Sequence, residues 1–492
     1  MKRDERRSFR LAYAAWLFGL IAYFLPPATW NPVSRFDLTR ALVEERTLAI
    51  DSFANNTGDR SLAHGHWYTG KPPFVSFAAA PFYALVHAAQ RVRGVEPGVT
   101  VVGSEVHPAV RVTPNRAFQQ ALYLCSLATS GILTVALALA LFELLRRRTT
   151  SRVAFVTATL VILGTPLFPY ATSFYSHVPA GALLLFAVVL LDVRGERPRG
   201  TLPSTARLRW AGACLALAPG CEYLTLFPAA VIGLWFVFET TRSERLRFAR
   251  ELAIGGSAPA VLLAAYHTAA FGAPWRTGYS FVTDPKFLAG HAGGLLGIHV
   301  PTWAGSYGLL LGVRRGLLYV SPLAVFGIMF GVQHARRRKD VAFAAGLAAL
   351  GTLFFLNAGY YMWWGGAAAG PRHLVPGMPF LAAGVMVGLR ERAQWVRWLT
   401  VGIGLVSIAN MFALTAVGIE APERGDILAG YAWPRLAAGR LATYAGGSNL
   451  GMKLGLEGLW SLAPLVLWGV GGFVYLYHRA TRRPAEPMSR VW

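Results

Sequence analysis

Residues 117–152 read AFQQALYLCSLATSGILTVALALALFELLRRRTTSR, an apolar run that ends in a basic cluster. The run from 117 to 145 exceeds the about 20 mostly apolar residues that a helix needs to cross the hydrocarbon core of a membrane. Four arginines follow between residues 146 and 152, and short cytoplasmic loops collect Lys and Arg. This stretch therefore predicts a membrane-spanning helix that ends on the cytoplasmic side.

Similar apolar runs, separated by short basic or longer mixed loops, recur along the whole chain. No internal repeat is evident, nor two matching halves of the kind that many transporters show. The fold class that this pattern predicts is an all-α polytopic membrane protein with about twelve spans. These lie at about 11–28, 117–145, 153–172, 177–193, 208–220, 222–239, 250–271, 316–334, 341–360, 373–389, 395–417 and 457–478.

The composition of the 492 residues supports this fold class and excludes others. Hydrophobic residues make up 54% of the chain and charged residues 14%, against roughly 25% charged residues in soluble globular proteins. The apolar fraction excludes a disordered chain, and three cysteines are too few for a disulfide framework. The net charge of +23 would suggest nucleic acid for a soluble protein; here it sets topology, so we expect no nucleic-acid partner.

The basic clusters predict how the chain is oriented in the membrane. They all fall on one side only if the Ala-rich stretch 72–90 does not cross, so we expect 72–90 to be an amphipathic or re-entrant element on the outer face. Both termini are then cytoplasmic, in an inner (plasma) membrane, and the long loops 26–116, 272–315 and 417–456 lie outside. The clusters are 1–10, 146–152, 192–209, 240–250, 334–340, 390–397 and 479–492.

The first outer loop is dense in side chains that carry chemistry. Apolar positions between Arg35 and Ile50 fall near helical spacing, which predicts a surface helix on the bilayer interface. Two aspartates, Asp37 and Asp51, lie near the start and the end of this helix. Each could serve as a base or only favour a helix end, as Asp37 would through the helix dipole.

The second half of the same loop reads NTGDRSLAHGHWYTGKPP (56–73). Its first four residues predict a turn that contains Asp59. His66 and Tyr68 could bind substrate, although a solvated histidine is an equally open interpretation for His66. Lys71 precedes Pro72 and Pro73, which stiffen the chain beside its ammonium group; Lys71 could bind an anion or extend to lipid head groups.

Further candidate residues come from the other outer segments and from the ends of spans. Tyr175 and His177 lie at the mouth of one span, and Glu222 lies at a tight hairpin where an ionisable residue entering a span is a functional candidate. Arg314 and Arg315 form an adjacent basic pair in an outer loop. The segment YYMWWGGAAAGPRHLVPGMPF (360–380) holds Trp364, Arg372 and His373; its aromatic residues could equally form an interfacial belt.

These segments together resemble the GT-C fold of integral-membrane glycosyltransferases. The similarity is to the family 39-like branch, which includes protein O-mannosyltransferases and the lipid A aminoarabinose transferase. It rests on the loop from Ser34 to KPPF (71–74), on FGAPWRTGYS (271–280), on GLLLGVRRGLLYVSPL (308–323) and on WWGGAAAGPRHLVPGMPF (363–380). We therefore expect a GT-C-like module over 1–417, followed by an outer loop, a last span and a basic tail over 418–492.

The resemblance implies a membrane glycosyltransferase that acts on the outer face with inversion. Its donor would be a polyprenyl-phosphate sugar, hexosyl or pentosyl, and its acceptor a hydroxyl or phosphate on a lipid, glycan or protein. In the family an acid of the first outer loop takes the acceptor proton. The usual Asp-Glu pair is missing before Ser34-Arg35-Phe36, so Asp37 is the first candidate for this base and Asp51 the second.

The resemblance also implies roles for the other candidates. Lys71 matches the lysine of the KPP motif, which lies near the donor phosphate in relatives. The donor phosphate is also assigned to Arg372, Arg315 and Arg314, and the substrates to His66, Tyr68, Tyr175, His177, Glu222, Trp364 and His373. No cofactor is certain from the resemblance, but some relatives use a divalent cation, which Asp37 and Glu222 could share.

The sequence pattern also allows other functions. A secondary transporter or a flippase for lipid-linked sugars could also have twelve spans. That class favours ionisable residues deep within spans and internal repeats, whereas the ionisable residues here are concentrated in loops and at span ends. A ligase that moves an undecaprenyl-linked glycan would share the GT-C fold and differ in its donor.

Overall fold

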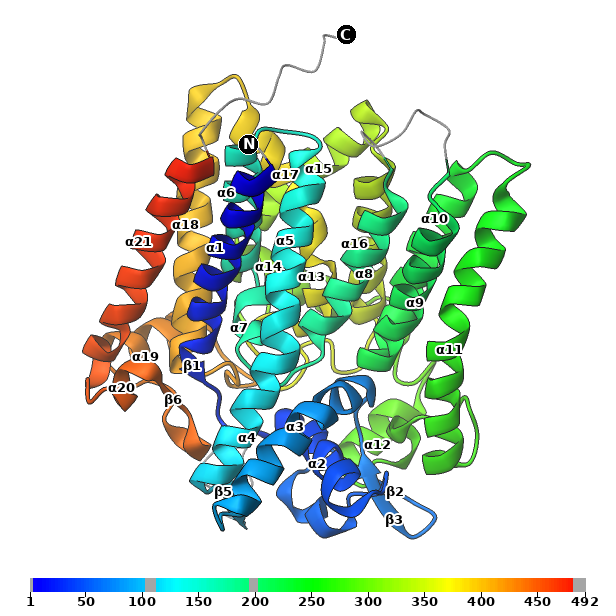
Figure 1. Ribbon diagram of the computed structural model, residues 1–492, viewed down its shortest axis with the longest axis vertical. Helices are drawn as coiled ribbons and strands as arrows, with labels where there is room; N and C mark the ends of the chain where they lie inside the picture. Colours follow the sequence, from blue (N-terminus) through cyan, green and yellow to red (C-terminus); the bar gives the residue numbers. More distant parts are fainter. Residues whose placement is uncertain (1–2, 102–111, 194–201, 481–492) are drawn as a thin grey trace.

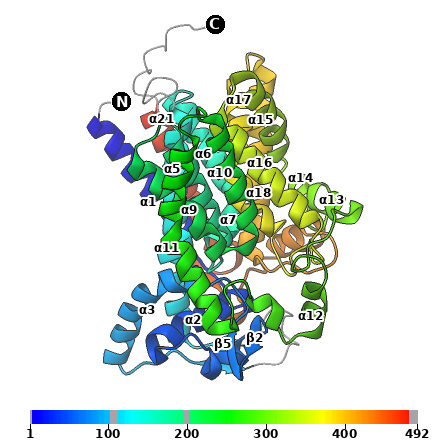
Figure 2. The same ribbon diagram turned by 90° about the vertical axis from the view of Figure 1, so that its right-hand side faces the viewer.

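The computed structural model describes residues 3–101, 112–193 and 202–480, and within them the chain is predominantly helical. Long helices run side by side as a bundle, and shorter elements gather at one of its ends (Figures 1 and 2). The bundle helices are α1 (Arg3–Ala22), α5 (Ile132–Arg146), α6 (Ser151–Gly164), α8 (His177–Leu191), α9 (Thr205–Cys221), α10 (Leu226–Glu239), α11 (Arg245–Phe271), α15 (Ala324–Arg338), α16 (Val341–Ala358), α17 (Ala382–Arg390), α18 (Gln394–Val417) and α21 (Ala463–Ala480).

The shorter elements connect these helices, and most of them lie toward one end. The helices outside the bundle are α2 (Trp30–Arg40), α3 (Phe74–Val92), α4 (Arg116–Ser126), α7 (Leu167–Ala171), α12 (Pro285–Ala292), α13 (Trp303–Leu310), α14 (Leu317–Val320), α19 (Trp433–Ala437) and α20 (Leu450–Lys453). Three antiparallel strand pairs join β1 (Phe24–Leu25) to β6 (Ser448–Asn449), β2 (Arg60–Ala63) to β3 (His66–Thr69), and β4 (Val99–Val101) to β5 (Val112–Pro114). We call the end formed by α2, α3 and the β2–β3 hairpin the loop end (Figure 1).

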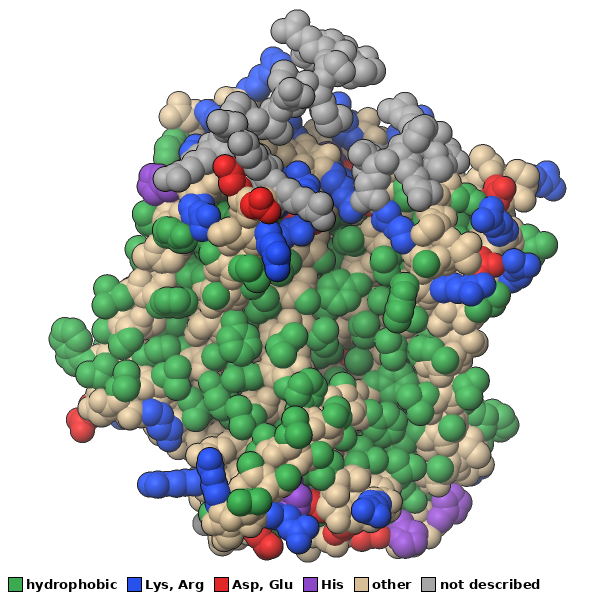
Figure 3. All heavy atoms as spheres, in the orientation of Figure 1, with side chains coloured by type: hydrophobic (Ala, Val, Ile, Leu, Met, Phe, Trp, Pro, Cys, Tyr) green, Lys and Arg blue, Asp and Glu red, His purple; other side chains and the backbone are tan. Residues whose placement is uncertain are grey.

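The structure confirms an all-α polytopic membrane protein. Each predicted span overlaps a bundle helix. Within the described residues, six helical segments are long and apolar enough to cross a membrane: Arg116–Arg146, Arg245–Phe271, Val341–Ala358, Arg372–Arg390, Gln394–Val417 and Gly458–Ala480. Figure 3 shows hydrophobic side chains across the middle of one face, with charged side chains toward both ends. Leu467 on α21 is 74% exposed, as expected of a side chain that faces lipid.

Small residues let some of the bundle helices approach closely, as is common in membrane proteins. A Cβ atom at Gly212 of α9 would lie 2.0 Å from the backbone oxygen of Leu252 on α11. A Cβ atom at Gly255 of α11 would lie 1.9 Å from the backbone oxygen of Arg209. Both positions therefore require glycine, and together they hold α9 and α11 in backbone contact.

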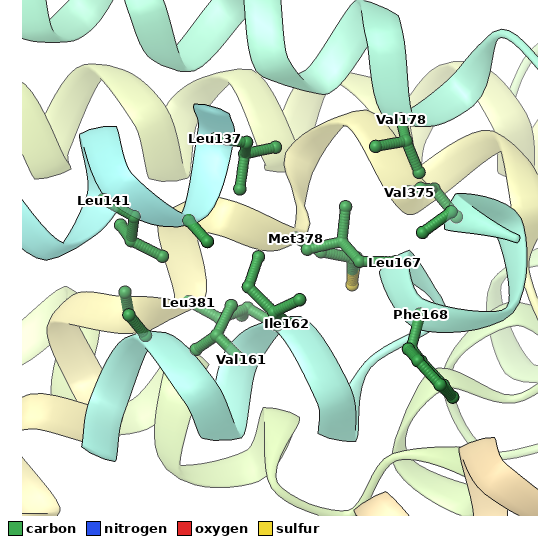
Figure 4. Packing of buried hydrophobic residues seen from close by; sticks show 14 of the residues in the cluster. Leu137, Leu141, Val161, Ile162, Leu167, Phe168, Val178, Val375, Met378 and Leu381 are labelled. Carbon is green, nitrogen blue, oxygen red and sulfur yellow. The ribbon is translucent and has the colours of Figure 1, made fainter. Parts of the chain in front are cut away.

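The apolar core fixes a 3₁₀ segment, Arg372–Leu381, against the bundle. Its side chains Val375, Met378 and Leu381 are buried with Leu137 of α5 and Val178 of α8 (Figure 4). At Gly181 of α8, a Cβ atom would lie 3.0 Å from the Cα of Pro376. This packing sets the start of the 3₁₀ segment, and hence Arg372 and His373, beside the start of α8.

Helix α3 covers most of the stretch that we expected not to cross the membrane. It lies with α2 at the loop end rather than alongside the bundle helices (Figures 1 and 2). The first residues of α1 and the last residues of α21 lie at the opposite end of the bundle (Figure 1). Most of the basic tail 479–492 lies outside the described residues, and the side of the membrane that each end faces stays a prediction.

The predicted surface helix over 35–50 is wrong in its extent and its exposure. Helix α2 ends at Arg40, a π-helical turn covers Ala41–Glu45, and a 3₁₀ turn follows at Asp51–Asn56. Residues 31–40 are all buried. The Phe36 ring, for example, packs edge-on against Tyr83 of α3 and Phe118 of α4, with ring centroids 5.1 and 5.0 Å apart. Helices distant in sequence cover the face that the pattern assigned to water.

Candidate active site

The β2–β3 hairpin brings an acid and a base together at its open end. Ala63 pairs with His66 across a two-residue turn, His64–Gly65, in which both residues have positive φ angles (52° and 82°); two-residue hairpin turns favour this geometry. Asp59 and Lys71 flank the paired strands, and the Gly70 N–H donates to the Asp59 backbone oxygen at 3.1 Å. The Lys71 Nζ lies 3.0 Å from the Asp59 Oδ1.

The ammonium group of Lys71 lies in a site that is largely shielded from solvent. Its side chain is 14% exposed and that of Asp59 is 18% exposed. Burial lowers the pKa of Lys71, and the neighbouring cations Arg372 and Arg35 lower it further. The negative charge of Asp59 opposes this lowering. A dehydrated site in which cations repel one another favours the binding of an anion.

Arg35 connects α2 to two other parts of the site. Its Nη1 donates to the backbone oxygen of Pro72 at 3.1 Å, directly after Lys71, and its Nη2 donates to the Ser176 Oγ at 2.8 Å, directly before α8. Its Nε donates to Asn31 Oδ1 at 3.2 Å. The side chain is fully buried. Arg35 was not among the predicted site residues, because one arginine in a predicted surface helix carries no distinctive signal.

Arg372 enters the same cluster from the 3₁₀ segment. Its buried Nε has no hydrogen-bond partner, and its charge interacts with Asp59, Glu222 and Tyr175. Gly365 lies against this side chain: a Cβ atom there would be 3.1 Å from the Arg372 Cγ, and its φ of +72° also favours glycine. The structure thus brings the predicted phosphate ligands Lys71 and Arg372 together. The Nε of Arg372 has a hydrogen bond left to donate to a ligand.

Three predicted substrate-binding residues form a buried group next to these cations. They are His177, the first residue of α8, Glu222, which follows α9, and His373. Their possible ligand atoms all lie within 4.8 Å of one another. Among the described residues, this is the only group of three or more potential metal ligands that meets this criterion. Asp37 is not part of it. The structure therefore does not support the pairing of Asp37 and Glu222 around a cation.

Tyr175 packs against His177. The two rings are stacked with centroids 5.8 Å apart. The Tyr175 hydroxyl donates to the Glu420 Oε1 at 3.2 Å, and Glu420 also accepts hydrogen bonds from Thr29 and Tyr444. Glu420 thus anchors Tyr175, and nothing in its sequence neighbourhood pointed to this role.

Arg315 has a different place from the one we predicted. It is fully buried, and its nitrogens donate to the backbone oxygens of Arg314, Trp364, Gly366, Ala421 and Pro422 at 2.7–3.2 Å. The guanidinium therefore clamps two loops together. Arg314 lies over the Trp364 ring, 4.4 Å from its centroid, and the Trp364 Nε1 donates to Glu423 at 3.3 Å.

We expect Arg315→Lys to destabilise the protein by about 2–3 kcal/mol, because a lysine ammonium cannot reach all of these carbonyl groups and leaves buried acceptors unpaired. The apparent melting temperature in detergent measures this loss. Arg276→Lys, at an exposed position, is the matched control and should leave the melting temperature unchanged. An unchanged value for Arg315→Lys would show that the clamp contributes no net stability.

Asp37 and Asp51 have other partners than the cluster of Lys71, Arg372 and Arg35. Asp37 is fully buried, and its Oδ1 accepts a hydrogen bond from Asn56 Nδ2 at 3.0 Å, while its Oδ2 has no partner. Asp51 is exposed, where its carboxylate lies 2.7 Å from the His66 Nδ1 and accepts the Trp67 N–H at 2.6 Å. Tyr68 packs against the ring of Phe271 at 5.5 Å.

Asp37 predicts a distinctive dependence of stability on pH. Burial raises its pKa from 3.8 to about 8, against the lowering effects of Asn56 and Arg40. Between about pH 4 and 8 the folded chain keeps this proton and the unfolded chain loses it, so stability falls as pH rises. We expect Asp37→Asn to melt at least about 3 °C above wild type at pH 8.5 and close to wild type at pH 4.5.

Asp51→Asn is the matched control for this pH series. Burial of Asp51 is outweighed by the Trp67 N–H and His66, which lower its pKa, so its ionised form favours the folded state. Asp51→Asn should therefore melt below wild type at pH 7, and the difference should vanish as the pH falls through the ordinary carboxyl range. If Asp37→Asn and wild type have the same melting temperature at every pH, the buried carboxyl is ionised in the folded protein.

No family model and no curated protein matches the chain. The solved structure of ArnT from Cupriavidus metallidurans in the apo state matches with a TM-score of 0.52 and 14% identity, over 98% of this chain and 78% of that one. ArnT and the oligosaccharyltransferase AglB are GT-C membrane glycosyltransferases. The chain has the GT-C fold.

Two archaeal structures with the GT-C fold also match. The oligosaccharyltransferase of Archaeoglobus fulgidus tethered to an acceptor peptide has a TM-score of 0.51 and 13% identity, over 90% of this chain and 58% of that one. AglB of the same organism, with an inhibitory peptide and a dolichol-phosphate, has a TM-score of 0.50 and 12% identity, over 84% and 55%. The chain thus spans little more than half of the archaeal chains, and identities this low establish the fold alone.

Proposed function

We propose that the protein transfers a sugar from a polyprenyl-phosphate donor to an acceptor hydroxyl or phosphate. The observation that carries this proposal is the buried cluster of Lys71, Arg372 and Arg35 with one carboxylate, Asp59, at its edge. Low-dielectric surroundings strengthen the interaction of such cations with a phosphate. The GT-C fold supports the proposal, since a structure with that fold holds a dolichol-phosphate.

In this proposal the acceptor oxygen attacks the anomeric carbon of the donor. A new carbon–oxygen bond forms as the bond from that carbon to the phosphate oxygen breaks, and a single displacement inverts the anomeric centre. Asp59 takes the acceptor proton. The bonding electrons leave with polyprenyl phosphate, whose added negative charge Lys71 and Arg372 stabilise. Asp59 replaces Asp37 and Asp51 as our candidate base because it alone of the three contacts the cluster.

We place the reaction on the outer face of the inner membrane, where a lipid donor would enter at the height of the head groups. The site lies at the loop end, opposite the first residues of α1 (Figure 1). Because basic clusters mark the cytoplasmic side and α1 begins with one, the loop end would face outward. The sugar class, hexosyl or pentosyl, and the lipid, glycan or protein acceptor depend on parts of the substrates that the cluster does not discriminate.

The proposal is tested by incubating the purified protein in liposomes with a panel of radiolabelled polyprenyl-phosphate sugars and an envelope extract as acceptor. We expect the label to leave the donor lipid and to appear in a larger acceptor. Movement of chemically intact donor between leaflets, without transfer, would instead identify a flippase. Absence of both transfer and movement with every donor would contradict a role in lipid-linked sugar chemistry.

A further inference from the structure

The group formed by His177, Glu222 and His373 has the composition and size of a metal site. The three residues come from different elements and are all nearly buried, with 1%, 4% and 8% of their surface exposed. Their candidate ligand atoms lie within 4.8 Å of one another. Ligands held about 2.0–2.2 Å from a common ion would lie somewhat closer than this limit, so small side-chain rotations suffice to close the site.

The histidine nitrogens of this group lack the hydrogen bonds that buried imidazoles need. Both ring nitrogens of His177 and the Nδ1 of His373 are buried without a partner. The His177 Nδ1 lies 3.1 Å from the Glu222 Oε2 but does not form a hydrogen bond of acceptable geometry with it. An unpaired buried polar atom is costly, and a shared ion would give one nitrogen of each ring a partner.

A second layer of contacts orients the group. The Ser176 Oγ donates to the Glu222 Oε2 at 3.2 Å, and Ser176 in turn accepts a hydrogen bond from Arg35 at 2.8 Å. The ring of His177 lies at 87° to that of His373, with centroids 5.6 Å apart. Hydrogen bonds of this kind to a coordinating carboxylate are characteristic of protein metal sites.

We propose that His177, Glu222 and His373 bind a divalent transition-metal ion. Two imidazoles and a carboxylate suit zinc, and three protein ligands leave its fourth position open. The cations Arg35, Arg372 and Lys71 also act on this group, so an anion is the ligand best suited to the open position. The transfer reaction proposed above is written without this ion, so the two proposals stand or fall separately.

The test measures metal content and affinity of the full-length protein in detergent. The protein is stripped with a chelator, dialysed, and titrated with ZnCl₂ in a calorimeter, and bound zinc is counted by mass spectrometry. We expect about one tightly bound zinc per chain. Glu222→Gln and His177→Ala should weaken binding at least about tenfold, because each removes one of three ligands. His373→Cys should retain binding, since a thiolate also coordinates zinc.

His66→Ala is the matched control, because His66 and Asp51 form an exposed pair that could bind zinc adventitiously. This variant should keep the tight site. The proposal is overturned if the stripped wild type binds no zinc in the titration. It is also overturned if folded Glu222→Gln and His177→Ala bind zinc as tightly as wild type, with folding verified by elution as a monodisperse peak. Either result would leave the three residues as a hydrogen-bonding group without a metal.

Discussion

Lys71→Met should lower the turnover of sugar transfer by about 10²–10³-fold. The substitution keeps the length and apolar stem of the side chain and removes the ammonium that lies 3.0 Å from Asp59 in a largely dehydrated site. Loss of a single preorganised charge-stabilising group has effects of this size on reactions that develop negative charge. Single-turnover rates with saturating donor separate this loss from weakened donor binding.

The control for this prediction is Lys286→Met. Lys286 on α12 also faces an acid, Glu423, at 3.8 Å, but its side chain is 64% exposed. An exposed pair of this kind contributes little, so turnover should stay within about twofold of wild type. Lys71→Arg should retain part of the activity, because it keeps the charge and changes its geometry. Turnover of Lys71→Met close to that of wild type would remove Lys71 from the reaction.

Asp59→Ala should lower turnover by about 10²–10⁴-fold, the range associated with loss of a general base. Asp59 contacts Lys71, so its loss could also act by letting that ammonium move. Chemical rescue separates the two roles: added formate should restore part of the turnover of Asp59→Ala if the carboxylate accepts the proton. Loss of activity without rescue, together with a raised KM for the donor, would make Asp59 a positioning residue.

Asp37→Asn gives the matched comparison within the same loop. Its carboxyl group is enclosed, hydrogen-bonded to Asn56, and outside the cluster. We expect its turnover at pH 7 to stay within about threefold of wild type, since the substitution preserves the acceptor oxygen and the packing. A large loss in Asp37→Asn with full activity in Asp59→Ala would restore Asp37 as the base.

The bundle was predictable from the sequence because hydrocarbon imposes a length and a composition on every span. The basic clusters added the prediction that 72–90 does not cross, and α3 indeed lies at the loop end. The burial of α2 could not be predicted in this way. Its apolar and charged positions fit an interfacial helix, and contacts with later parts of the chain, among them α3, β3 and Ser176 before α8, bury its residues.

The site was predictable in part. His177, Glu222, Arg372 and His373 stand at or beside span ends and Lys71 in the first outer loop, all in unusual segments, and the structure brings them together. Asp59 was assigned to a turn, although the alternation around His64–Gly65 could have indicated a hairpin that places Asp59 opposite Gly70, the neighbour of Lys71. Arg315 could not be placed from the sequence: its phosphate role stays a prediction, and its hydrogen bonds go to backbone carbonyl groups of two loops.

Release of polyprenyl phosphate reports the proposed cleavage between sugar and phosphate itself. Wild type and Lys71→Met are incubated side by side with a labelled polyprenyl-phosphate sugar and acceptor, and the lipid products are separated by chromatography. We predict that wild type releases polyprenyl phosphate in step with transfer and that Lys71→Met releases about 10²–10³-fold less. Equal release by the two proteins, or none by wild type with any donor, would contradict the account.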